Sequence, residues 1–149
     1  ENAILTARHA AHATGRPAIA DDSGLVVPAL GGAPGIYSAR YSGGGDTENN
    51  TKLLSEMSHL TGEDRAAFYV AVIAVVMSES DPLPIIAEGR WYGEISLERS
   101  GTGGFGYDPL FIPEASSCTA AEMSLAEKQA LSHRAKALKA LAPKLLNCQ

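Results

Sequence analysis

Two adjacent carboxylates interrupt an apolar stretch near the start of the chain. Asp21 and Asp22 follow the apolar residues 18–20 and precede Ser23 and Gly24. Ionised carboxylates are costly to bury unless they are paired, protonated or bound to a metal ion. Because successive strand residues point to opposite faces, only one of the two can easily face a given cleft. The pattern fits a metal-associated carboxylate, and a solvent-facing Asx turn explains the same residues.

A glycine-rich loop is the second candidate site. Residues 101–106 contain four glycines, and Phe105 and Tyr107 add aromatic faces. Glycine lets the backbone come close to a ligand. A dinucleotide fingerprint is excluded by context, because the loop continues into Tyr107, Asp108 and Pro109 instead of opening a helix in a βαβ unit. A ligand-binding loop and a flexible hairpin exit both remain open.

Basic residues gather near the end of the chain. Ser132, His133 and Arg134 begin the last expected helix, and Lys128 precedes them. A helix N-terminus favours electronegative groups, although a solvated basic helix end also explains the triplet. His9 and His12 are three residues apart on the first expected helix. Because no third metal ligand is visible beside them, we interpret both as surface histidines.

Helices and strands alternate along the chain, which predicts one α/β domain with a central β-sheet flanked by helices. Apolar periodicity, caps and turn residues define the expected elements. The expected helices are 1–14, 46–57, a short one begun by the capping box Ser124–Glu127, and one from 132 onward. The expected strands are 18–27, buried with the two carboxylates at its end, 66–77, buried on both faces, and 83–98, which forms a hairpin with it.

The last helix has a definite expected apolar face. Ala135, Leu138, Leu141 and Leu145 recur at helical spacing, which predicts that they face the core. Pro143 is expected to kink or fray the end of this helix.

Size and composition favour a small-molecule ligand. The chain has 149 residues and a formal net charge of −5, which argues against binding to nucleic acid or to a membrane surface. Its longest apolar run, residues 70–77, is far shorter than the roughly 20 residues of a membrane helix. We interpret the two cysteines, Cys118 and Cys148, as free thiols of a cytoplasmic protein.

Five segments, taken in order, resemble the signature blocks of the inosine/xanthosine triphosphate pyrophosphatase family. They are Asn2-Ala3, Ile19 to Leu25, Leu30 to Tyr41, Gly103 to Pro109 and Ser132 to Arg134. The resemblance implies hydrolysis of deaminated purine nucleoside triphosphates (ITP, dITP and XTP) to the monophosphate and pyrophosphate. It also implies a Mg²⁺ requirement, an elongated mixed sheet, an active site in a central cleft, and a homodimer.

The resemblance assigns roles to individual residues. Asp22 matches the catalytic, metal-associated aspartate, and Ser23 matches its nucleotide-contacting neighbour. The other matches are Phe105, Gly106, Tyr107 and Asp108 in the base-binding loop, Lys128 as a nucleotide-binding lysine, and His133 with Arg134 as the pair that reads the purine.

The sequence departs from the family pattern in two places. The family's opening strand and phosphate-binding loop have no counterpart, so we expect residues 1–149 to be one pyrophosphatase domain without that segment. Thr6 stands where the family usually has a substrate-binding lysine. Both departures predict weaker triphosphate binding. The alternatives are an inactive fragment or nucleotide-binding module, and a pyrophosphatase for other modified nucleotides.

Overall fold

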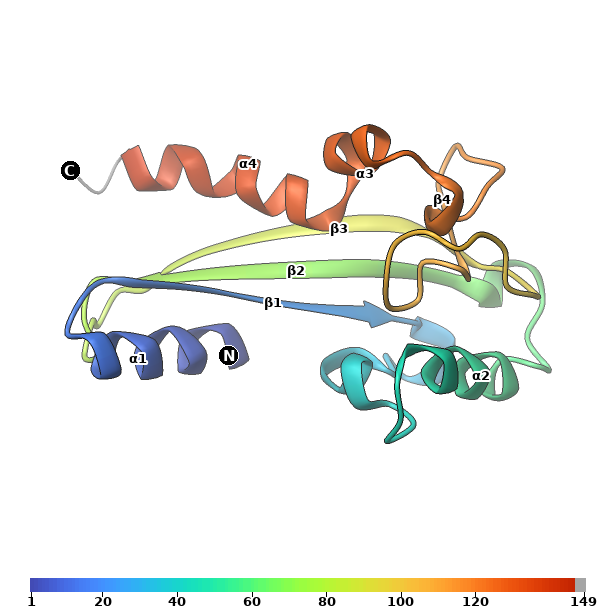
Figure 1. Cartoon of the computed structure of the whole chain (residues 1–149), viewed down its shortest axis with the longest axis horizontal. Coiled ribbons are helices and arrows are strands. Elements are labelled where there is room, and N and C mark those ends of the chain that lie inside the picture. The colour runs from blue at the N-terminus through green and yellow to red at the C-terminus, as the bar shows by residue number, and fades with distance from the viewer. Residues whose placement is uncertain (147–149) are drawn as a thin grey trace. The chain divides into compact units, whose positions relative to one another are not determined.

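The computed structural model describes residues 1–146 and has the predicted α/β class. Four strands form one sheet in the order β1 (Ala18–Val26), β2 (Ala66–Val76), β3 (Ile85–Ile95) and β4 (Phe111–Pro113) (Figure 1). Strands β3 and β4 are antiparallel, with Glu94 opposite Ile112. The helices are α1 (Asn2–Thr14), α2 (Asp46–Glu56), α3 (Leu125–Leu131) and α4 (His133–Leu146), with short 3₁₀ helices η1 (Pro28–Leu30), η2 (Gly35–Arg40), η3 (Gly62–Arg65) and η4 (Ala120–Glu122).

The chain divides into two compact units. Unit 1 comprises residues 1–23, 70–90 and 132 onward, and unit 2 comprises residues 24–69 and 91–131. Each unit has its own buried core. The assignment of residues 1–149 to a single catalytic domain stays a prediction.

In unit 1, the alanine pattern of α1 has a direct structural counterpart. Ala3, Ala7 and Ala11 are buried and pack with Ala74 and Val76 of β2. Small residues at this spacing let a helix approach a strand closely, because no long side chain separates the backbones.

Helix α4 approaches β3 even more closely at a glycine. A Cβ atom at Gly89 would collide with the backbone carbonyl of His133 and the backbone nitrogen of Ala137. A side-chain hydrogen at position 89 is therefore what lets the first turn of α4 lie against β3.

The prediction of a buried first strand is wrong in two respects. Ile19 is 59% exposed, so side chains of other elements do not cover its face of β1 at this point. Asp21 and Asp22 also lie in the middle of β1 and not at its end, since the strand continues to Val26.

The predicted apolar face of the last helix is only partly correct, because Leu141 is buried as expected but two of the other leucines are not. The buried residues of α4 are His133, Ala137 and Leu141, each four residues apart, so they share one face of the helix. Leu138 is 56% exposed and Leu145 is 40% exposed. The helix does not end at Pro143 but continues to Leu146.

Unit 2 is built around a larger core that includes aromatic side chains. Tyr69 and Trp91 stack at 6.3 Å between ring centroids, and Phe111 contacts both rings. Arg65 is buried beside this core and donates hydrogen bonds to four backbone carbonyls. Burial lowers the pKa of its guanidinium. This residue ties η3 to the end of β3.

The observed face of α4 predicts which leucine stabilises unit 1. Leu141→Ala should lower the free energy of unfolding by about 2–5 kcal/mol, because it opens a cavity in a packed site. Leu138→Ala, on the same helix, should change it by less than about 0.5 kcal/mol, because that side chain is exposed. Urea denaturation of both variants measures the difference. Equal losses would mean that the predicted face, and not the observed one, is buried.

Candidate functional site

In unit 1, the two adjacent aspartates have different environments. The Asp21 carboxylate forms an ion pair with Arg134, at 3.4 Å between Oδ2 and Nε. Ser132 caps α4, since its Oγ accepts a hydrogen bond from the Ala135 amide at 3.2 Å. The structure thus brings the first aspartate of the pair together with the arginine predicted to read the purine.

Asp22 and Ser23 are the other predicted residues on β1. Alternation along a strand places Asp22 on the opposite face from Asp21, and Asp22 forms no ion pair within residues 1–146. The Oγ of Ser23 is buried and has no hydrogen-bond partner among these residues. A buried hydroxyl without a partner is destabilising. A polar ligand or metal ion bound here could contact the half-buried Asp22 carboxylate and supply the hydrogen-bond partner that the Ser23 hydroxyl lacks among residues 1–146.

In unit 2, the Asp108 carboxylate organises the glycine-rich loop. Asp108 is 3% exposed. Its Oδ1 accepts a hydrogen bond from the Tyr69 hydroxyl at 3.0 Å. Its Oδ2 accepts the Phe105 amide at 3.1 Å and pairs with the Lys128 ammonium at 2.6 Å. Phe105 and Lys128, two of the predicted binding residues, therefore meet at the buried carboxylate of a third, Asp108.

The two aromatic residues of the loop differ in exposure. Phe105 is 57% exposed, and the Lys128 Nζ lies 4.8 Å from the centroid of its ring. Tyr107 is 3% exposed and its hydroxyl donates to the Ser38 carbonyl at 2.6 Å. Burial raises the pKa of Tyr107, and the charge of Asp46 adds to this effect. Of the two rings, Phe105 is the one available to stack on a ligand.

Helix α2 holds the peptide groups of Gly106 from both sides. The Gly106 amide donates to Oδ2 of Asp46 at 2.8 Å. The Asn50 side-chain amide donates to the Gly106 carbonyl at 2.9 Å. These two residues lie four apart on α2, so they face the same way, and they fix the loop at Gly106.

The comparison with known families decides the assignment. The Ham1 family model matches residues 1–144. This chain belongs to the Ham1 family. A dITP/XTP pyrophosphatase of Haemophilus influenzae is 54% identical over 147 residues, covering 97% of this chain and 75% of the relative. A dITP/XTP pyrophosphatase of Pseudomonas aeruginosa is also 54% identical, over 97% of this chain and 74% of the relative. The family predicted from the signature blocks is confirmed.

Solved Ham1 structures agree with the fold. A HAM1 protein from Coxiella burnetii matches with a TM-score of 0.92 and 47% identity, over 98% of this chain and 75% of that one. The Staphylococcus aureus Ham1 protein matches with a TM-score of 0.90 and 41% identity, over 99% of this chain and 76% of that one.

Three residues of the site were missed by the sequence analysis of this Ham1 chain. Asp46 is the first residue of α2, where an acidic residue usually serves the helix end, and Asn50 lies one turn later, where a polar residue usually faces solvent. Tyr69 lies in an apolar strand that reads as core. A phenolic hydroxyl in such a strand needs a buried partner, and this requirement is the signal that could have identified Tyr69.

Metal-binding groups are sparse in the described part of the chain. Residues 1–146 contain no cluster of three or more His, Cys, Asp or Glu side chains arranged to hold a metal ion. His9 and His12 are exposed, as predicted, and His12 pairs with Glu79. Cys118 is a free thiol, and Cys148 lies outside the described residues.

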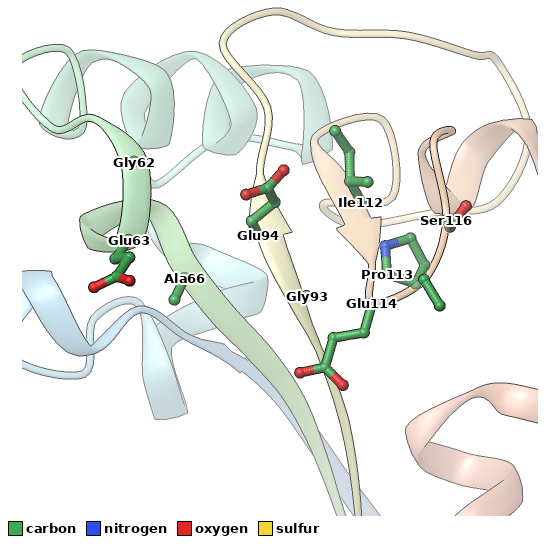
Figure 2. A pocket seen from close by; sticks show the side chains of 10 residues that line it. Gly62, Glu63, Ala66, Gly93, Glu94, Ile112, Pro113, Glu114 and Ser116 are labelled. Atoms are coloured by element: carbon green, nitrogen blue, oxygen red, sulfur yellow. The ribbon is translucent and has the colours of Figure 1, made fainter.

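Two neighbouring pockets of unit 2 contain none of the residues predicted to bind the nucleotide. A cavity of about 380 Å³ is lined by Glu63, Glu94 and Glu114, and their carboxylates point in different directions (Figure 2). A second cavity, of about 500 Å³, shares Glu94 and Ile112 with it.

The clamp on Gly106 predicts a local effect of one substitution. Asp46→Ala should speed hydrogen exchange at the Gly106 amide, because that amide loses its acceptor. Glu56→Ala, at the exposed far end of α2, is the matched control and should leave the rate unchanged. Amide exchange followed by NMR measures both. Unchanged exchange in Asp46→Ala would show that the carboxylate does not hold the loop.

Proposed function

We propose that this chain hydrolyses ITP, dITP and XTP to the corresponding monophosphate and pyrophosphate, removing deaminated purine nucleotides from the nucleotide pool. The proposal rests on 54% identity to a dITP/XTP pyrophosphatase over 97% of the chain. The match of the family model to residues 1–144 includes segments of both units.

Selection of the base depends on hydrogen-bond donors. Hypoxanthine and xanthine carry an acceptor oxygen at C6, where adenine carries an amino donor. Arg134 and His133 can donate to the oxygen, whereas adenine would leave these donors unpaired. The ion pair with Asp21 favours one orientation of the Arg134 guanidinium. The exposed ring of Phe105 supplies a surface on which the purine stacks.

Asp22 is the proposed catalytic base. It orients a water molecule toward the α-phosphorus and accepts its proton as the new P–O bond forms and pyrophosphate departs. Ser23 donates its buried hydroxyl, which has no partner within residues 1–146, to a phosphate oxygen. Lys128 brings a positive charge to the nucleotide, and Asp108 holds its ammonium in place.

Mg²⁺ is the proposed cofactor. A single carboxylate together with substrate phosphates is a common magnesium site, and the half-buried Asp22, which forms no ion pair in the described chain, suits this role. When bound, the metal neutralises charge on the triphosphate.

We expect EDTA to abolish pyrophosphate release and added Mg²⁺ to restore it. Full activity in EDTA would rule out the cofactor.

Two further features of the proposal come from the sequence: the family resemblance implies a homodimer, and the low number of cysteines favours the cytoplasm. We propose a homodimer located in the cytoplasm. Within residues 1–146 no helix is long and apolar enough to cross a membrane.

The catalytic assignment predicts that substitutions of the two aspartates change different kinetic constants. Asp22→Asn should lower kcat by at least about 100-fold, because it removes the base. Asp21→Asn, the matched control, should raise KM and leave kcat within about twofold, because it releases Arg134 from its ion pair without touching the base. ³¹P NMR of ITP with Mg²⁺ measures both products. Near-normal kcat in Asp22→Asn would remove this residue from the mechanism.

The same assay tests the reaction and its selectivity. ITP is expected to give monophosphate and pyrophosphate, and ATP under the same conditions is expected to give neither. Inorganic phosphate as the direct product would contradict the proposed reaction. Faster turnover of a modified pyrimidine nucleotide in a substrate panel would favour the alternative pyrophosphatase, and binding without turnover would favour a nucleotide-binding module.

A further inference from the structure

We infer that Tyr69 is a positioning residue for nucleotide binding: its hydroxyl fixes the Asp108 carboxylate, and through it the place of Phe105 relative to Lys128. The inference deepens the proposed function and rests on it. Tyr69 belongs to β2, far from the glycine-rich loop in sequence, and has no role in the assignments made from the family blocks.

Tyr69 is itself held rigidly. Its side chain is 7% exposed, its ring lies 4.8 Å from that of Phe111 in an edge-on contact, and it stacks on Trp91. Aromatic packing of this kind restricts the ring. The hydroxyl therefore presents its hydrogen bond from a fixed point of the unit 2 core.

The hydroxyl supplies a donor that the Asp108 carboxylate requires. Oδ1 of Asp108 accepts the Tyr69 hydroxyl, while Oδ2 accepts Phe105 and Lys128. An oxygen of a carboxylate that is 3% exposed is destabilised if it loses its partner. Burial and the nearby Asp108 charge hold the pKa of Tyr69 well above its ordinary value, so the hydroxyl keeps its proton and remains a donor.

The geometry links one carboxylate to two binding groups. Oδ2 holds the backbone of Phe105 and the ammonium of Lys128 together. If Asp108 shifts, the stacking surface and the cation shift with it. Because Tyr69 is buried and its hydroxyl bonds to Asp108, its loss should weaken nucleotide binding and leave the chemical step unchanged.

Steady-state kinetics of Tyr69→Phe with ITP and Mg²⁺ tests this inference. The variant keeps the ring and removes the hydroxyl. We expect KM to rise about tenfold, with kcat within about twofold of the wild type. Phe111→Leu is the matched control, because it disturbs the same aromatic cluster without removing a donor from Asp108, and it should leave KM unchanged. An unchanged KM in Tyr69→Phe, or an equal rise in Phe111→Leu, would overturn the inference.

A double-mutant cycle separates positioning from general destabilisation. In an Asp108→Asn background, Tyr69→Phe should add less than about a twofold change in KM, because its target is already altered. Additive tenfold effects would show that Tyr69 acts independently of Asp108.

Hydrogen exchange keeps the inference distinct from the proposed function. If the wild-type chain releases no pyrophosphate from ITP, the proposed function fails, and the positioning role is then decided by the Phe105 amide. That amide donates to Asp108, so it should exchange faster in Tyr69→Phe than in Phe111→Leu. Equal rates would overturn the inference whatever the activity.

Discussion

A buried carboxylate that accepts three donors constrains the whole of the binding loop. Asp108 receives the Tyr69 hydroxyl, the Phe105 amide and the Lys128 ammonium. A charge at this depth is tolerated only while these donors stay in place. The strand, the loop and the short helix that supply them must therefore keep a common geometry. The glycines around position 105 let the backbone fold closely about this carboxylate, since a Cβ at Gly104 would collide with it.

The sequence predicted the elements better than their environments. Helix and strand positions follow from local signals, and the capping box is present as expected, with mutual hydrogen bonds between Ser124 and Glu127. Burial depends on which neighbours an element meets, and local sequence patterns do not specify those neighbours. The exposure of Ile19 and the burial of Ala137 instead of Leu138 both arise in this way.

The candidate site shows the same division. The signature blocks predicted which residues bind the nucleotide, but their spacing does not reveal that Asp21 pairs with Arg134 or that Tyr107 belongs to the core. Both facts depend on contacts between distant segments. The resemblance therefore predicted the role of each residue, and the structure showed its contacts. Those contacts place Asp21 beside Arg134 and leave Phe105, not Tyr107, as the exposed aromatic ring.

The close contact at Gly89 has a consequence for how this family tolerates sequence change. The backbone of α4 lies where any side chain at that position would stand, so even alanine would push the helix outward and carry His133 and Arg134 with it. In a scan of random variants, Gly89 would then tolerate substitution as poorly as the proposed binding and catalytic residues. Intolerance at Gly89 would reflect the short distance between the backbones of α4 and β3, not a role in catalysis.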